Sequence, residues 1–361
     1  MIKVLVVDDS ALMRKLLGQI FARESDFTVD FAPNGLEAID KLNVFEPDVI
    51  TLDVHMPLMD GLTCLDRIML ERPCPVVMLS SLTAADANAT LEAFRLGAVD
   101  FVAKPSGAAS LYIDELAPEL LLKVRAAASA KLKSSLRLKD RIRHRVGSAP
   151  SGLRSVRSMA SPAMDTATGE GLVLVGTSTG GPPALEALLT GLPARFPWPI
   201  LIAQHMPATF TGPLARRLDC LSALSVMEVS EPVLVKGGCA YIGRGGADLV
   251  VHRRAAGLVA SPVASQPDYL WHPSTDRLVR SALDCLPASQ LVGVLMTGMG
   301  NDGAAAMTLM HQQGGRTIAE AQDTAVVWGM PGELVQMGGA DFIVSLPGIA
   351  EQLCKLTPVC P

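Results

Sequence analysis

Short, largely apolar runs recur along this chain, and most of them are followed by a segment with helical periodicity. They occupy positions 4–7, 49–52, 76–79 and 101–103, and the pattern resumes at 172–175, 200–203, 240–242, 249–251, 291–296 and 317–319. Runs that are apolar on both faces are typical of parallel strands buried between helices. The repeated β–α pattern therefore predicts an α/β fold with a doubly wound parallel sheet in each half of the chain.

The length and the local composition indicate how these units are grouped. The chain has 361 residues, more than one ordinary core holds, so we expect two domains, at residues 1–106 and 169–361. Residues 111–130 fit an amphipathic helix, residues 131–157 are strongly basic with Asp140 as their only acid, and the stretch up to 170 is rich in small residues and proline. We predict that residues 107–168 form a basic, partly helical linker.

The bulk composition excludes several classes of protein. The formal net charge of −5 argues against a nucleic-acid binder, and we interpret the basic segment as a solvated connector in preference to a nucleic-acid patch. The longest uncharged stretch, residues 196–215, contains four prolines, so we expect no membrane insertion. Seven scattered cysteines without metal-ligand spacing indicate reduced thiols and a cytoplasmic protein.

Polar residues follow the apolar runs of the first half at the point where each predicted strand ends. They are Asp8, Asp9, Asp53, Ser80 and Lys104. Ligands of open α/β sheets bind beyond the carboxyl ends of the strands, so we expect these side chains to lie together. Clustered carboxylates suit Mg²⁺, one carboxylate can attack phosphorus, and a lysine can hold phosphoryl oxygens. Each residue alone is more typical of a helix cap or a solvated surface, but the set predicts a phosphorylation site.

The second half offers the three members of a hydrolytic triad in three distant segments. Ser178 lies in Gly-Thr-Ser-Thr-Gly between a strand and a helix, His205 follows the next strand, and Asp302 lies in Gly-Asn-Asp-Gly after a later one. A serine at a strand-to-helix turn can act as a nucleophile, with a histidine base that a carboxylate orients. Ser178 could equally cap its helix or bind an anion, and His205 could be an ordinary loop residue. The order serine, histidine, acid disfavours an α/β-hydrolase fold.

The same carboxylate segment also matches a dinucleotide-binding fingerprint. Gly298, Gly300 and Gly303 have the required spacing, follow a strand and precede a helix-like segment, with Glu320 further on. This pattern supports an alternative reading as a nucleotide-dependent oxidoreductase. Against it, Asp302 would place a carboxylate beside a bound pyrophosphate at a helix N-terminus, where anions are favoured.

The first half resembles the receiver domain of two-component response regulators, which is flavodoxin-like. The resemblance rests on Val-Asp-Asp-Ser at 7–10, Leu-Asp-Val-His-Met-Pro-Leu-Met-Asp-Gly at 52–61, Leu-Ser-Ser at 79–81 and Val-Ala-Lys-Pro at 102–105. It implies that Asp53 is the phosphoacceptor and that Asp8 and Asp9, with Asp53, hold Mg²⁺. It also implies switching roles for Ser80, Phe101 and Lys104.

The second half is similar to the Rossmann-like catalytic domain of the chemotaxis methylesterase family, CheB. The matching motifs are Gly-Thr-Ser-Thr-Gly-Gly at 176–181, Gln-His-Met-Pro at 204–207 and Thr-Gly-Met-Gly-Asn-Asp-Gly at 297–303. The resemblance implies Ser178 as nucleophile, His205 as base and Asp302 as orienting acid, with an oxyanion contribution near Met299 and a polar supporting role for Thr179.

This second resemblance also implies an activity and partners. The activity would be hydrolysis of glutamate γ-methyl esters on chemoreceptors, with deamidation of receptor glutamines, and the esterase reaction would need no cofactor. The phosphodonor would be the chemotaxis histidine kinase CheA, and the unphosphorylated receiver would cover the active site. A non-enzymatic regulator with a DNA- or protein-binding output remains an alternative, although no helix-turn-helix pattern is apparent.

Overall fold

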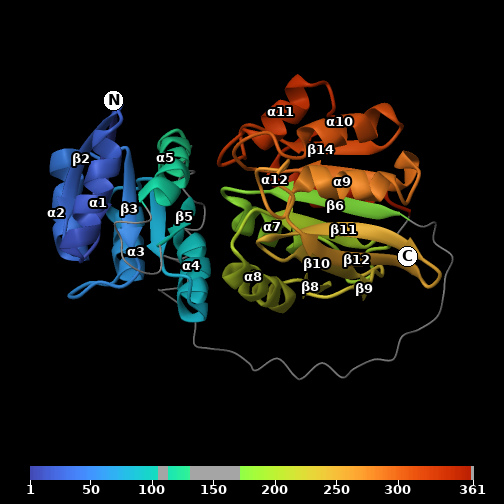
Figure 1. Ribbon diagram of the computed structural model, residues 1–361, viewed down its shortest axis with the longest axis horizontal. Helices are drawn as coiled ribbons and strands as arrows, with labels where there is room; N and C mark the ends of the chain where they lie inside the picture. Colours follow the sequence, from blue (N-terminus) through green and yellow to red (C-terminus); the bar gives the residue numbers. More distant parts are fainter. Residues whose placement is uncertain (105–112, 131–170, 359–361) are drawn as a thin grey trace, which may run out of the picture.

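The computed structural model describes residues 1–104, 113–130 and 171–358, which form two α/β bodies lying side by side (Figure 1). The predicted fold class is confirmed. The two bodies are called the receiver body and the catalytic body below.

The receiver body is built on five parallel strands in the order β2-β1-β3-β4-β5. The strands are β1 (Ile2–Val7), β2 (Phe27–Ala32), β3 (Val49–Asp53), β4 (Val76–Ser80) and β5 (Asp100–Ala103). The helices are α1 (Ala11–Ala22), α2 (Gly35–Phe45), α3 (Gly61–Glu71), α4 (Ala84–Leu96) and α5 (Ile113–Ala128). The strand order reverses between β1 and β3, so their carboxyl ends flank the crevice where such sheets bind ligands.

Local sequence fixes where the first four of these helices begin. The residues before α1, α2, α3 and α4 are Ser10, Asn34, Asp60 and Thr83, and each side chain accepts a hydrogen bond from the backbone N–H three residues later. Such caps satisfy N–H groups that the first turn of a helix leaves free. They let each helix begin close behind a strand end and keep the phosphorylation loops short.

The helix that the sequence analysis placed in the linker belongs to the receiver body. Leu116, Leu120 and Val124 of α5 are buried in one cluster with apolar residues of α1, β1, β4 and β5. The side-chain period of a strand sends alternate residues to the two faces of the sheet, and α5 lies beside α1 on the same face. The receiver body therefore includes α5, which lies beyond the boundary predicted at residue 106. The predicted basic segment at 131–157 lies outside the described residues.

The catalytic body contains a seven-stranded parallel sheet in the order β15-β14-β13-β6-β7-β10-β8. The strands are β6 (Leu172–Thr177), β7 (Ile200–Gln204), β8 (Ser225–Val229), β10 (Cys239–Gly243), β13 (Leu291–Leu295), β14 (Arg316–Glu320) and β15 (Phe342–Val344). The helices are α7 (Gly181–Thr190), α8 (Ala208–Leu221), α9 (Thr275–Leu283), α10 (Ala304–Gln312), α11 (Met330–Gln336) and α12 (Leu346–Leu356), with a short 3-10 turn, η2 (Ala288–Gln290). Its order reverses between β6 and β13.

A small antiparallel sheet, which the sequence did not predict, adds to this body. It consists of β9 (Val233–Leu234), β11 (Ala247–Arg254) and β12 (Gly257–Ala264) in the order β11-β12-β9. The apolar run at 249–251, expected to continue the β–α pattern, pairs with β12 instead. Its polar flanks allow one face of this sheet to meet solvent while Leu249 and Val251 pack on the catalytic body.

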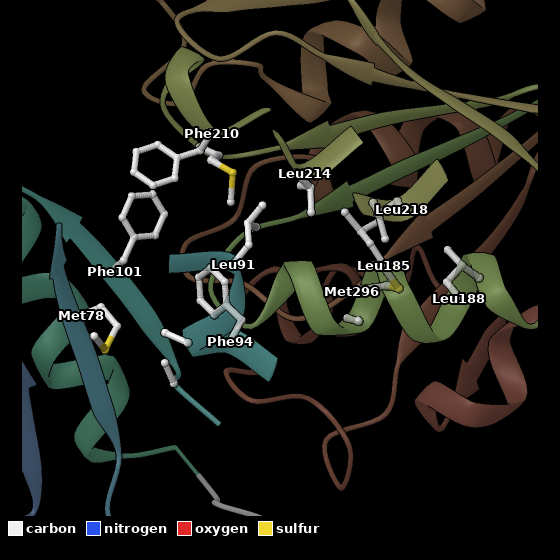
Figure 2. Packing of buried hydrophobic residues seen from close by; sticks show 14 of the residues in the cluster. Met78, Leu91, Phe94, Phe101, Leu185, Leu188, Phe210, Leu214, Leu218 and Met296 are labelled. Carbon is white, nitrogen blue, oxygen red and sulfur yellow. The ribbon is translucent and has the colours of Figure 1, made fainter. Parts of the chain in front are cut away.

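The two bodies share one apolar contact surface. Leu91 and Phe94 of α4 and Phe101 of β5 belong to the same buried cluster as Leu214 and Leu218 of α8 (Figure 2). The ring centroids of Phe101 and Phe210 lie 4.4 Å apart, and Phe210, in α8, is fully buried. The receiver thus packs on the catalytic body through its α4–β5 side, which Figure 1 shows facing α7 and α8.

Candidate active site

Ser178 lies at the turn between β6 and α7, as the sequence predicted. Its backbone N–H donates to Thr297 O (3.0 Å), its carbonyl accepts from the side-chain amide of Gln204 (3.1 Å), and the residue is 9% exposed. Gly180, two residues later, has φ of +75°, a conformation that favours glycine and lets α7 begin at once. The serine is therefore held rigidly at the edge of the sheet, next to the point where the strand order reverses.

His205 follows β7, the neighbour of β6, so the two strand ends place it beside Ser178. Its backbone N–H donates to Thr177 O across the strand pair (3.1 Å). Its Nε2 lies 2.8 Å from Asp302 Oδ2, and its ring stacks on the indole of Trp271 with centroids 5.2 Å apart and planes 7° from parallel. Both the tautomer and the plane of this imidazole are therefore defined by neighbours.

Asp302 is buried against the N-terminus of α9. Its oxygens accept hydrogen bonds from Ser274 Oγ (2.9 Å) and from the backbone N–H groups of Thr275 (2.6 Å) and Asp276 (3.0 Å), besides His205. Burial is the largest influence on the pKa of Asp302 and raises it, but the bonds from His205 and the helix N–H groups together hold the pKa below its ordinary value. The carboxylate stays ionised and can stabilise an imidazolium.

The contact with Asp302 decides which nitrogen of His205 is the base. Nε2 carries the proton that Asp302 accepts, so the lone pair is on Nδ1. Nδ1 is buried, and within the described ranges it has no hydrogen-bond partner. The arrangement leaves Nδ1 free to take a proton from a nucleophile arriving from the serine side.

The glycines of the dinucleotide fingerprint have a packing role in this structure. A Cβ on Gly298 would lie 2.8 Å from Ser178 Cβ, and one on Gly303 would lie 2.6 Å from a methyl group of Thr275. These glycines let the loop after β13 reach both the serine and the start of α9. Asp302, which lies between Gly298 and Gly303, binds His205. Its negative charge at this point argues against a pyrophosphate site.

Thr179 and Met299 flank the serine from two sides. Thr179 Oγ1 donates a hydrogen bond to a carboxylate oxygen of Asp100, at the start of β5 in the receiver body. Met299 is buried on the loop after β13 that passes Ser178. In this arrangement the Thr179 hydroxyl is therefore bound to a residue of the other body.

The receiver residues converge as the sequence predicted. Ligand oxygens of Asp8, Asp9 and Asp53 all lie within 4.8 Å of one another. Lys104 Nζ lies 2.8 Å from Asp8 Oδ2 and 2.7 Å from Asp53 Oδ2. Burial raises the pKa of Asp53, with Asp8 adding to the rise, while Lys104 opposes it. The three carboxylates converge, and Asp9 is exposed to solvent. This set of oxygen donors fits Mg²⁺.

The two remaining switch residues lie between this cluster and the catalytic body. Ser80 is buried at the end of β4, where its Oγ accepts a hydrogen bond from Thr90 Oγ1 of α4 (2.9 Å). Phe101 is 2% exposed, and its backbone carbonyl accepts from Lys123 Nζ (2.6 Å). A change at Ser80 therefore has a short path through α4 and β5 to the interface with α8.

Two contributors to the site were missed by the sequence analysis. Trp271 supplies the ring that stacks on His205, and Ser274 caps α9 while also binding Asp302. The dipeptide Pro273-Ser274 before an amphipathic helix is a signal of a helix start, whose free N–H groups need an acceptor. Nothing comparable in the sequence predicts the position of Trp271.

A receiver-type phosphorylation site joined to a paired histidine and carboxylate beside a serine defines a class of protein, a response regulator with a hydrolase-like output domain. Family profiles agree, because the response regulator receiver profile matches residues 4–113 and the CheB methylesterase profile matches residues 173–353. The chain belongs to the CheB methylesterase family.

Relatives are similar over nearly the whole chain. A protein-glutamate methylesterase/protein-glutamine glutaminase 2 of Rhodopseudomonas palustris is 56% identical, covering 97% of this chain and 96% of its own. A protein-glutamate methylesterase/protein-glutamine glutaminase 3 of Rhodospirillum rubrum is 50% identical, covering 98% and 95%. The crystal structure of the Thermotoga maritima CheB methylesterase catalytic domain is 35% identical, with a TM-score of 0.51, and covers 52% of this chain and all of that one.

Proposed function

We propose that this protein hydrolyses glutamate γ-methyl esters on the cytoplasmic helices of chemoreceptors, releases methanol, and also deamidates receptor glutamines. The observation that carries the proposal is the His205–Asp302 pair beside Ser178 at the point where the strand order reverses. The names of the relatives that match nearly the whole chain supply the substrate class.

The reaction we propose is acyl transfer in two steps. Ser178 Oγ attacks the ester carbonyl while His205 Nδ1 takes its proton, and Asp302 stabilises the imidazolium through Nε2–H. The tetrahedral intermediate expels methoxide, which leaves as methanol with the proton from His205. Water then attacks the acyl-enzyme by the same route and releases the free glutamate. With a glutamine substrate the leaving group is ammonia.

Two further residues support the chemistry in this proposal. The backbone N–H near Met299 stabilises the oxyanion, because its loop is held against Ser178 by the close approach of Gly298. Thr179 offers a hydroxyl to the substrate side once its bond to Asp100 is broken. The esterase reaction itself needs no cofactor in this scheme.

The receiver gates this site in our proposal. Asp53 accepts a phosphoryl group from the histidine kinase CheA. Asp8, Asp9 and Asp53 would hold Mg²⁺, which would supply positive charge to balance that of the phosphoryl oxygens. Lys104 and Ser80 bind the new phosphoryl group, and movement at Ser80 and Phe101 weakens the interface with α8. Opening then frees Thr179 from Asp100 and exposes Ser178. A bias of a few kcal/mol is enough for such a population shift.

The proposed substrate lies on the cytoplasmic helices of membrane receptors, so we propose that the protein is cytoplasmic itself. Over residues 1–104, 113–130 and 171–358, no helix has both the length and the apolar character needed to cross a bilayer. The proposal includes no nucleic-acid partner.

The test is methanol release from methylated, receptor-containing membranes, with and without a small-molecule phosphodonor and Mg²⁺. Wild type is compared with Ser178→Ala, and both proteins are also exposed to a fluorophosphonate probe that labels activated serines. Release that rises with phosphodonor and vanishes in the variant supports the whole proposal. Probe labelling without methanol release refutes the substrate but keeps the hydrolase. Absence of both favours a non-enzymatic output, and nicotinamide fluorescence on titration would expose the oxidoreductase alternative.

A further inference from the structure

Three contacts fix the position of His205, and one of them, with Trp271, has no role in the mechanism above. Asp302 binds Nε2, the backbone of His205 is bonded to β6, and the indole of Trp271 covers the ring face at 5.2 Å and 7°. Parallel stacking at this distance limits rotation of the imidazole about its side-chain bonds. A half-buried tryptophan on the loop before α9 thus has a specific geometric relation to the base.

The loop of Trp271 is itself anchored by a buried carboxylate. Asp248, near the start of β11, has a fully buried side chain. Its Oδ1 lies 2.9 Å from His272 Nδ1 and accepts from the backbone N–H of Ser274 (2.8 Å), and its Oδ2 accepts from Arg277 Nη1 (2.6 Å). A charge without solvent contact needs such partners, so the loop and the first turn of α9 are tied firmly to β11.

These two observations join at the catalytic pair. The segment that Asp248 binds carries Trp271 at one end, and Ser274 and Thr275, both of which donate to Asp302, at the other. One buried carboxylate therefore fixes both the ring that stacks on His205 and the donors that orient Asp302. Neither Trp271 nor Asp248 is needed to explain the fold of the seven-stranded sheet, which is complete without β11.

We propose that Trp271 is a positioning residue for His205, and that Asp248 holds Trp271 in register through His272, Ser274 and Arg277. The indole keeps the imidazole in the orientation with Nε2–H on Asp302 and the Nδ1 lone pair toward Ser178. The stacked ring also favours the imidazolium that forms as the serine loses its proton, because an aromatic face attracts a cation. This proposal rests on the proposed hydrolase site and adds residues to it.

The first test is kinetic and uses the full-length, phosphodonor-activated protein. We expect Trp271→Ala to lower kcat for methanol release about tenfold with little change in KM, since a misplaced base slows the chemical step. Trp271→Phe keeps an aromatic face and should retain most of the rate. Leu270→Ala is the matched control, because Leu270 is 86% exposed and adjacent in sequence. An unchanged kcat in Trp271→Ala, or a raised KM alone, would overturn the positioning role.

The second test needs neither substrate nor activity. Histidine-selective ¹⁵N spectra of wild type, with His205 assigned through His205→Gln, should show the Nε2–H tautomer. Trp271→Ala and Asp248→Asn should both shift His205 toward a mixture of tautomers, while Trp271→Phe should not. Identical tautomer populations in all of these proteins would refute the proposal. This readout separates the two hypotheses, because it remains valid even if receptor esters prove not to be the substrate.

Discussion

The interface between the two bodies gives the sharpest quantitative prediction, and Phe210→Ala is the perturbation that isolates it. Phe210 belongs to α8 of the catalytic body, so its removal leaves the phosphorylation site and Phe101 unchanged. Its ring lies 4.4 Å from that of Phe101, tilted by 35°. In the closed arrangement the two rings hide each other from water, and opening exposes both.

The magnitude follows from this contact. An aromatic pair contributes about 1 kcal/mol beyond its buried area, and the apolar area that this pair covers adds about 1 kcal/mol more. Losing roughly 2 kcal/mol from the closed state raises the open-to-closed ratio roughly thirtyfold, at about 1.4 kcal/mol per factor of ten. The unphosphorylated variant should therefore release methanol up to about thirty times faster than unphosphorylated wild type, limited by the rate of the fully activated enzyme.

The assay is methanol release without phosphodonor, with thermal unfolding measured in parallel. Phe196→Ala is the matched control, because Phe196 is equally buried in the catalytic body but precedes β7, at the sheet edge away from Ser178. Both variants lose fold stability, but only Phe210→Ala should gain basal activity. A folded Phe210→Ala protein with the basal rate of wild type would show that this contact does not restrain the enzyme.

The other predictions concern the two sites directly. Asp53→Ala should abolish activation by phosphodonor while leaving basal methanol release, and EDTA should do the same to wild type; full activation of the variant would contradict the gating scheme. Asp302→Asn should lower kcat on the order of 10³- to 10⁴-fold. Because the pKa of Asp302 is lowered below its ordinary 3.8, its ionised form stabilises the fold above about pH 4, and this contribution is lost as the pH falls through the lowered value. Urea unfolding should therefore show a larger deficit for Asp302→Asn at pH 7 than at pH 3, and an equal deficit at both would refute the assignment. Gly298→Ala should abolish probe labelling of Ser178, since the new methyl group would lie 2.8 Å from Ser178 Cβ. Gly212→Ala should label normally, because the closest side-chain atom beyond its chain neighbours, a carboxylate oxygen of Glu228, would lie 3.3 Å from its methyl group.

The residues that perform the proposed chemistry were predictable because parallel strands impose a common edge. Ser178, His205 and Asp53 each follow a run that is apolar on both faces, and such runs mark buried parallel strands without any tertiary information. Cap residues such as Ser10 and Asn34 marked helix starts in the same way. The three residues of the Mg²⁺ donor set were predictable in the same way, because Asp8 and Asp9 directly follow one strand and Asp53 ends another.

The differences have a common physical cause, because a local pattern does not show which part of the molecule a segment packs on. Residues 113–128 have the periodicity of any amphipathic helix, and only the open face of the receiver sheet shows that α5 belongs there. The run at 249–251 is apolar like the parallel strands, yet it pairs antiparallel with β12 because the chain turns back directly after it. The fingerprint glycines matched a cofactor motif, but packing against Ser178 and Thr275 uses them.

The sequence by itself determined the elements, their parallel arrangement and the type of chemistry at each strand end, because side-chain periodicity and short-range capping are local properties. Only the tertiary structure decided that Asp302 binds Nε2 of His205 and leaves Nδ1 as the free nitrogen. It alone brought Trp271 onto the imidazole and Asp100 of the receiver to Thr179, beside Ser178. These contacts join residues from 66 to 97 positions apart, and their geometry depends on how two sheets and their loops pack, which no local pattern encodes.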